Sequence, residues 1–323
     1  MTIPHKILVA ESTGFSCRAA EFLRKIGDLH LADLDRSGLL RAVAEVDILW
    51  VRLRHYIDAE VMAAAPRLRY IASPTTGLNH IDIAEAEKRG VRIISLRGEA
   101  EFLNDIRATA EHTLALILAL YRHLSAAVLH TRQGGWQRDL FKGRELYGKT
   151  VGIIGYGRLG KIVARYLTAF DTRILATDPQ NSPGTKSAGI EFVSLPELLR
   201  ESDIVTLHAS YSLQNHQFFG AEQFSMMKKN AVFINTARGE LVEETALLNA
   251  LETGQISAAA IDVLNGENTL QNLSGHALLK YARSHNNLLI TSHTGGCTVE
   301  SMEKTEVFLA EKLSRVLALQ NNG

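Results

Sequence analysis

Short hydrophobic runs alternate with amphipathic helical patterns in two separate parts of the chain. The first part contains helical segments such as residues 16–27 and four expected strands: KILVA (6–10), DILWV (47–51), LRYIAS (68–73) and VRIIS (91–95). The rhythm restarts after residue 148 with six more: TVGII (150–154), TRILATD (172–178), DIVTLHA (203–209), AVFINTA (231–237), SAAAIDV (257–263) and NLLITSH (287–293). Strands joined through helices run parallel and are covered by helices. The pattern predicts an α/β protein with two doubly wound parallel sheets.

Two helical patterns lie outside this alternation. The longest covers about 107–133 and ends at Gly134 and Gly135, and a helix of that length fits between two domains. The last, 297–320, is amphipathic. It places these hydrophobic residues near one face: Val299, Met302, Leu309, Leu313 and Val316. Since it follows the last strand of the second sheet, it is able to cross back and pack on the first domain.

Composition excludes several classes of protein. Of 323 residues, 46% are hydrophobic, and 35 basic side chains balance 35 acidic ones, so no excess of positive charge indicates a nucleic-acid partner. The most apolar run, TLALILALY (113–121), is shorter than the roughly 20 residues of a membrane span and is expected to be a buried helix. Cys17 and Cys297 are too few for a disulfide framework or a zinc site, and MTIPHKILVA lacks a secretory pattern. We expect a cytoplasmic protein with no metal and no membrane partner.

A glycine-spaced turn follows the first strand of the second sheet. Gly155, Gly157 and Gly160 form G-x-G-x-x-G between a strand and a helix, a context that favours binding of a dinucleotide pyrophosphate. Asp178 lies 18 positions after Gly160 at the end of the next strand, where a carboxylate binds the ribose 2′-hydroxyl and repels a 2′-phosphate. This predicts NAD rather than NADP. A sharp strand-to-helix turn without a ligand, with Asp178 a surface turn residue, is the alternative.

Three polar side chains follow later strands of the same sheet. Arg238 stands in INTARG (234–239), Glu267 in IDVLNGE (261–267) and His293 in ITSHTGG (290–296). Ligands of open α/β sheets bind at these carboxyl ends. An arginine matches a carboxylate, a histidine exchanges protons near neutral pH, and a glutamate beside it favours the charged imidazolium. Each residue taken singly could be a surface group; together they predict an acid–base pair with an anion clamp.

These motifs resemble the D-isomer-specific 2-hydroxyacid dehydrogenase family over about residues 47–315. The resemblance rests on GIIGYGRLG (152–160), the Asp-Pro pair at 178–179, SDIVTLHA (202–209), INTARG, AAIDV (259–263) with its later glutamate, and ITSHTGG. It implies NAD-dependent transfer of a hydride between the nicotinamide and a 2-hydroxy or 2-keto acid. In that reaction His293 is the acid/base, Glu267 its partner, and Arg238 the residue that binds the substrate carboxylate.

The same resemblance assigns the remaining parts. It implies a substrate domain of residues 1–103 with 297–323, an NAD-binding Rossmann domain of 104–296, a cleft between them and a homodimer formed through the cofactor domain. SPTTGLNHID (73–82) is similar to the loop that holds the substrate carboxylate, through Thr75, Thr76 and Gly77. The residues expected along the cofactor are Thr109, Gly155, Tyr156, Gly157, Arg158, Leu159, Gly160, Asp178, His208, Ala209, Thr236, Ala237, Arg238, Asp262, His293 and Gly295.

Several positions depart from the family pattern. Asn268 and Ser292 stand where prolines are usual, and Ser73 replaces an arginine that binds phosphate in phosphoglycerate enzymes, which makes that substrate less expected. A second anionic group could instead meet Arg52, Arg54 or Arg97, although solvated surface arginines are an equal alternative. The stretch at 97–112 resembles a subgroup associated with sugar gene clusters and hints at a polar hydroxy acid.

Two other functions stay open at this point. An NAD-responsive regulator, similar to the C-terminal-binding corepressors, could keep all of these residues without physiological turnover. Formate oxidation occurs in related folds that carry a glutamine in place of the glutamate, and Glu267 argues against it.

Overall fold

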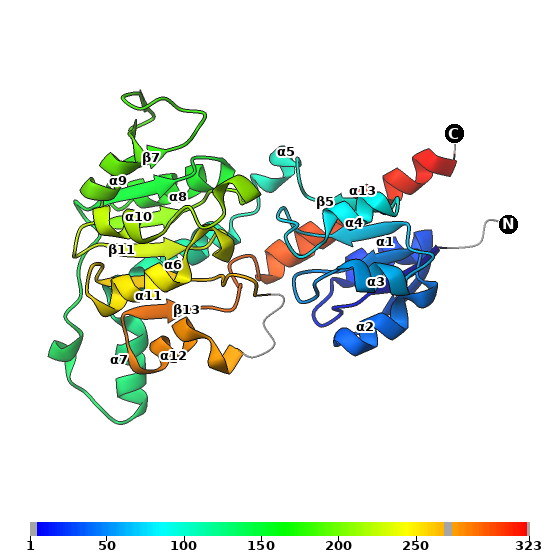
Figure 1. Ribbon diagram of the computed structural model, residues 1–323, viewed down its shortest axis with the longest axis horizontal. Coiled ribbons are helices and arrows are strands. Elements are labelled where there is room, and N and C mark those ends of the chain that lie inside the picture. The colour runs from blue at the N-terminus through cyan, green and yellow to red at the C-terminus, as the bar shows by residue number, and fades with distance from the viewer. Residues whose placement is uncertain (1–4, 268–272, 322–323) are drawn as a thin grey trace. The chain divides into compact units, whose positions relative to one another are not determined.

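The computed structural model describes residues 5–267 and 273–321. The chain forms two compact units, Met1–Ile106 with Cys297–Gly323, and Arg107–Gly296. Each unit is built on a sheet of mainly parallel strands with helices on both faces (Figure 1). The predicted α/β class with two doubly wound sheets is therefore confirmed.

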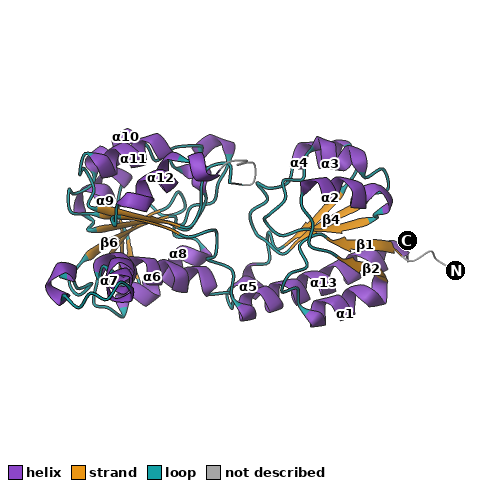
Figure 2. Cartoon of the chain, turned by 90° about the horizontal axis from the view of Figure 1, so that it is seen from below, coloured by secondary structure: helices purple, strands orange, loops and turns teal. Residues whose placement is uncertain are grey.

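The first unit has a five-stranded parallel sheet in the order β2-β1-β3-β4-β5, the flavodoxin-like arrangement. Its strands are β1 (His5–Val9), β2 (Gly27–Leu31), β3 (Ile48–Trp50), β4 (Tyr70–Ser73) and β5 (Arg92–Ser95). Its helices are α1 (Cys17–Ile26), α2 (Arg36–Ala42), α3 (Ala59–Ala64), α4 (Ile83–Lys88), α5 (Ala100–Leu103) and α13 (Val299–Asn321). Helices α2, α3 and α4 cover one face, and α1, α5 and α13 the other (Figure 2).

Successive side chains of β1 point to opposite faces of the sheet, so this short strand contributes to two hydrophobic cores. Leu8 packs among residues of α2 and α3, while Ile7 and Val9 pack on the other face against α1 and α13. Leu309 and Leu313 of α13 are fully buried there. The last helix therefore packs on the first sheet, although Val299, expected on its apolar face, is 81% exposed because it is the first helical residue.

The second unit has an eight-stranded sheet in the order β13-β12-β11-β10-β6-β7-β9-β8, parallel except for β8. Its strands are β6 (Thr150–Ile154), β7 (Arg173–Thr177), β8 (Lys186–Ser187), β9 (Ile190–Phe192), β10 (Ile204–Leu207), β11 (Val232–Asn235), β12 (Ala258–Ile261) and β13 (Leu288–Ile290). Its helices are α6 (Ala108–Tyr121), α7 (Leu124–Arg132), α8 (Arg158–Thr168), α9 (Leu195–Glu201), α10 (Ala221–Met226), α11 (Glu244–Glu252) and α12 (Ala277–Ser284). The reversal of order between β6 and β10 is the Rossmann switch point, where dinucleotides bind.

The prediction of a single helix over 107–133 is wrong. It breaks into α6 and α7, with a bend of 66° after Tyr121, because His123 adopts a left-handed conformation (φ 49°). Leu116, Ile117 and Leu120 are buried, as expected for the apolar run. Among the described residues no single helix has both the length and the apolar character to cross a membrane; one bent pair, Ala100–Tyr121 with Leu124–Arg132, meets those two criteria together.

Candidate active site

The glycine turn has the shape that a dinucleotide pyrophosphate requires. Gly155 has φ +92°, and a Cβ there would lie 2.6 Å from the backbone nitrogen of Ala209. A Cβ at Gly160 would overlap the Gly155 carbonyl oxygen, whereas at Gly157 it would meet no heavy atom within 4 Å. Gly157 starts α8 without a side-chain cap. The turn is thus closed on the protein side and open at the helix N-terminus, which fits NAD.

Asp178 joins the end of β7 to this turn. Its Oδ2 accepts a hydrogen bond from the Tyr156 backbone N–H at 2.8 Å, and its Oδ1 accepts one from the Gln180 N–H at 2.9 Å. Tyr156, Arg158 and Leu159 of the turn are half-buried. The structure therefore brings the predicted carboxylate and the glycine turn into direct contact.

The chain after β10 and β11 lies at the same edge of the sheet. His208 is 9% exposed, its Nε2 lies 3.0 Å from the Thr206 Oγ1, and burial lowers its pKa to about 3. Thr236 Oγ1 lies 2.8 Å from the Thr113 hydroxyl, and the Ala237 N–H donates to Asn235 Oδ1 at 3.0 Å. At neutral pH the surface formed by His208, Ala209, Thr236 and Ala237, called the neutral wall below, therefore carries no charge.

Arg238 follows β11 and is fixed by its neighbours. Asn235 Nδ2 donates to the Arg238 carbonyl oxygen at 2.9 Å, and an Arg238 guanidinium nitrogen donates to the Ala237 oxygen at 2.6 Å. Burial lowers the pKa of Arg238, and the nearby Glu267 and Glu240 carboxylates oppose that shift. An arginine keeps its charge in any case, so this half-buried cation attracts an anion.

Asp262 holds the turn that follows β13. Its Oδ1 accepts from the Thr291 hydroxyl at 2.5 Å and from the Thr294 N–H at 2.8 Å, and its Oδ2 accepts from the Gly295 N–H at 2.7 Å. Burial raises the pKa of Asp262, but hydrogen bonds from His112, Thr291 and the turn outweigh it and lower the pKa to about 2. The ionised carboxylate therefore organises residues 291–295.

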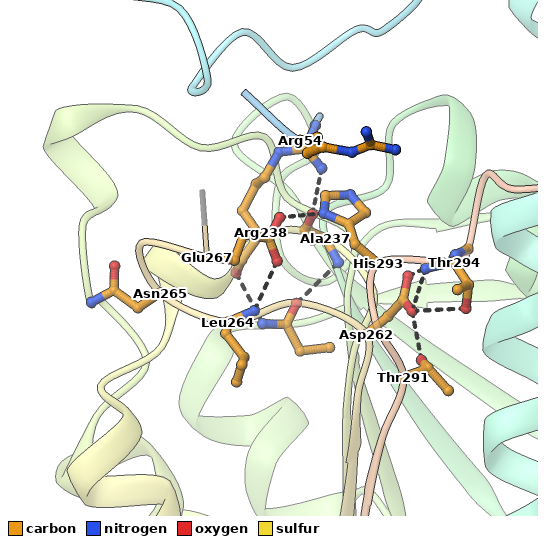
Figure 3. Close-up of polar contacts among 12 residues, drawn as sticks. Arg54, Ala237, Arg238, Asp262, Leu264, Asn265, Glu267, Thr291, His293 and Thr294 are labelled. Atoms are coloured by element: carbon orange, nitrogen blue, oxygen red, sulfur yellow. Dashed lines mark hydrogen bonds and ion pairs between the residues drawn. The ribbon is translucent and has the colours of Figure 1, made fainter. Parts of the chain in front are cut away.

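His293 lies on this turn, and its side chain points toward Glu267 (Figure 3). Its backbone is left-handed (φ 54°), and its N–H donates to the Asp262 carbonyl oxygen at 2.7 Å. Its Nδ1 pairs with Glu267 Oε1, and Glu267 Oε2 accepts from the Leu264 N–H at 3.2 Å. Both side chains are about one-fifth exposed, 20% and 18%. The predicted imidazole, carboxylate and guanidinium thus lie together (Figure 3).

The predicted substrate loop of the first unit follows β4. Thr75 Oγ1 donates to the Gly77 oxygen at 2.8 Å and lies 2.9 Å from the Ser73 hydroxyl, while Thr76 is exposed. The buried Ser73 hydroxyl also lies 3.0 Å from His80 Nε2. These contacts fix the loop at the carboxyl end of the strand.

The three additional arginines are in different surroundings. Arg52 pairs through two guanidinium nitrogens with Glu306, whose side chain is 1% exposed. Arg54 pairs with Asp33, and Arg97 is exposed. Arg52 and Arg54 are thus each compensated by a carboxylate of the same unit.

Sequence reasoning missed one group that supports the site, His112. His112 of α6 lies 3.3 Å from Asp262 Oδ1 and 2.9 Å from the Thr291 hydroxyl. Thr109, one turn earlier, lies against Gly295: a Cβ at that glycine would be 3.2 Å from its methyl group. The position of His112 three residues after Thr109, on one face of a helix, is the signal that could have indicated it. The expectation about Asn268 falls outside the described residues.

Comparison with known proteins identifies the family. The model of the D-isomer specific 2-hydroxyacid dehydrogenase NAD-binding domain matches residues 114–295. A glyoxylate reductase of Thermofilum pendens is 37% identical over 288 residues, covering 87% of this chain and 81% of that protein. The crystal structure of an Aquifex aeolicus D-lactate dehydrogenase, complexed with NAD and lactic acid, has a TM-score of 0.82 at 27% identity, covering 97% and 95%. The chain belongs to the D-isomer specific 2-hydroxyacid dehydrogenase family, and its second unit contains the NAD-binding domain.

Phosphoglycerate dehydrogenases are also similar but longer. The protein of Mycobacterium bovis is 36% identical over 285 residues, which cover 88% of this chain and 52% of that protein. The chain thus spans about half the length of the phosphoglycerate dehydrogenases that it matches.

Proposed function

We propose that this protein catalyses reversible hydride transfer between NAD and a D-2-hydroxy acid. The observation that carries the proposal is the His293–Glu267 pair beside Arg238, on turns at the carboxyl edge of an NAD-binding sheet. Bound NADH supplies the hydride to the carbonyl carbon of a 2-keto acid. Glu267 engages Nδ1 of His293, so Nε2 gives its proton to the carbonyl oxygen in reduction and recovers it in oxidation. Arg238 binds the substrate carboxylate.

The cofactor residues have separate tasks in this proposal. The N–H groups at the start of α8 would hold the pyrophosphate, and Asp178 would accept the ribose hydroxyls while disfavouring a 2′-phosphate. Asp262 holds Thr294 and Gly295 where they would meet the nicotinamide, and Thr109 packs against Gly295. The neutral wall of His208, Ala209, Thr236 and Ala237 would line the nucleotide.

We further propose that the substrate is a polar, non-phosphorylated acid held by Thr75, Thr76 and Gly77. Arg52 and Arg54 are neutralised by Glu306 and Asp33 and so lack the excess charge that a phosphate dianion requires. Arg97, which is exposed, is the additional cation available to a second carboxylate.

A substrate panel with NADH tests the reaction. We expect oxidation of NADH with glyoxylate, hydroxypyruvate, 2-ketoglutarate or larger polar keto acids, and little with NADPH or with a phosphorylated acid. Arg238→Lys should raise the KM for the keto acid about tenfold or more, because a lysine lacks the paired donors, while the Kd for NADH stays within about twofold. No turnover with any acid of the panel would contradict the proposal.

We also propose a homodimer formed through the second unit. Helix α7 has no buried residue among those described, and it exposes Leu124 (54%) and Leu129 (53%), followed by Trp136 (91%) and Leu140 (64%). An exposed apolar patch of this kind marks a protein interface. Light scattering should give twice the 35.6 kDa of one chain, and Leu129→Asp with Trp136→Ser should give monomers. A monomeric unmodified protein would contradict this.

A further inference from the structure

Glu267 lies on the chain between β12 and α12, and the described residues from Asp262 to Glu267 form bends and turns that belong to no helix or strand. Leu264 and Asn265 lie before Glu267, and His276 lies after it as the residue preceding α12. A reactive carboxylate on such a segment needs support from a rigid element, because errors of about 1 Å in its position lower rates strongly.

Glu244, the first residue of α11, contacts both flanks of this segment. Its Oε1 accepts a hydrogen bond from the Asn265 backbone N–H at 2.9 Å. Its Oε2 lies 3.0 Å from His276 Nε2. The Glu244 side chain is 21% exposed and that of His276 is 12% exposed, so both contacts are shielded from water. The Glu244 carboxylate therefore contacts the chain both before and after Glu267.

The contacts continue from Asn265 to the reacting groups. A Cβ at Gly239 would overlap the backbone of Leu264 and Asn265, so this part of the segment packs directly on the residue that follows Arg238. The Leu264 N–H, one residue before Asn265, donates to Glu267 Oε2, and Glu267 Oε1 pairs with His293. A shift of Asn265 consequently moves a donor that orients Glu267.

We propose that Glu244 is a positioning residue that sets the orientation of Glu267 toward His293. Glu244 acts through the Asn265 N–H and His276 and takes no part in proton transfer itself. This inference rests on the proposed dehydrogenase function, since it concerns the same acid–base pair. It assigns a task in the reaction to a residue 23 positions before Glu267 in the sequence.

The experiment compares Glu244→Ala with Glu243→Ala as a matched control. Glu243 is the preceding residue and also a carboxylate at the start of α11, and it accepts from the Thr245 hydroxyl rather than from the Glu267 segment. Both changes remove a charge from the same helix N-terminus, so the effect on the helix dipole is similar. Glu244→Gln, which keeps one acceptor oxygen, is the milder variant to use if Glu244→Ala unfolds at the assay temperature.

We expect Glu244→Ala to lower kcat about 10- to 100-fold while the Kd for NADH changes less than about twofold. Glu244→Gln should recover part of the loss, and Glu243→Ala should keep the original kcat. Deuterium exchange at the Leu264 and Asn265 amides should rise in Glu244→Ala and stay unchanged in Glu243→Ala.

A double-mutant cycle distinguishes positioning from a general structural effect. If Glu244 acts through Glu267, adding Glu244→Ala to Glu267→Gln should slow the reaction no further. Equal kcat for Glu244→Ala and Glu243→Ala, or two losses that multiply fully in the double variant, would overturn the inference. If Glu267→Gln and His293→Gln alone leave turnover unchanged, the proposed function fails instead.

Discussion

Replacement of Asp262 by asparagine tests how the turn that bears His293 is held. The carboxylate accepts from Thr291, Thr294 and Gly295, and its pKa is lowered from 3.8 to about 2. A difference of that size corresponds to about 2–3 kcal/mol of folding free energy at about 1.4 kcal/mol per pKa unit. Asparagine keeps the shape of the side chain but loses the charge and one acceptor. Asp262→Asn should therefore lower the free energy of unfolding by roughly this amount at pH 7.

The sign of the pH dependence follows from the lowered pKa. The charge contributes its full stabilisation above the unfolded-state value near 4 and loses it as pH falls toward 2, because the unfolded chain binds the proton more readily. About half of the contribution should remain at pH 3. Urea unfolding followed by circular dichroism at pH 7, 5 and 3 measures the difference between the two proteins. Asp28→Asn, on the exposed face of β2, is the control. A stability difference that is the same at pH 7 and pH 3 would refute the reasoning.

Further substitutions test the glycine turn and the Arg52 ion pair. Gly155→Ala should lower both the thermal unfolding temperature and the affinity for NADH, since its Cβ would meet the Ala209 backbone at 2.6 Å. Gly157→Ala should lower the affinity for NADH about tenfold or more without loss of stability. Arg52→Met should reduce the free energy of unfolding by about 3–5 kcal/mol, because it removes the cation that pairs with the buried Glu306 carboxylate. Arg52→Met with Glu306→Gln should recover most of that loss. Unchanged stability of Arg52→Met would contradict a structural ion pair.

The sequence predicted the parts of the site that lie at the ends of hydrophobic strands. Arg238, Asp262 and His293 each follow such a strand, and parallel strands bring their carboxyl ends to one edge of a sheet. Strand β2 was not predicted, because GDLHL has few hydrophobic residues and lies mostly exposed at the sheet edge. The break after Tyr121 was missed because it depends on the left-handed backbone of His123 and not on a proline or glycine.

Long-range supporting contacts could not be predicted from one sequence. Arg52 and Glu306 are 254 residues apart, and His112 reaches Thr291 across 179 positions. Local periodicity carries no information about such pairs, because they depend on which helix covers which face of a sheet. Thus the strand ends indicated the groups that we propose to react, whereas Glu244, Glu306 and His112 required the structure.

The most direct test of the central claim is the rate of hydride transfer in a single turnover across pH 6 to 9. NADH oxidation by the most active keto acid is followed in the unmodified protein and in His293→Gln, with NADH binding measured in both. The unmodified rate should fall as pH rises, because the protonated imidazole is the proton donor, and His293→Gln should bind NADH normally but react at least about 100-fold more slowly with a flat profile. A His293→Gln protein that keeps the original rate and pH profile would contradict the account.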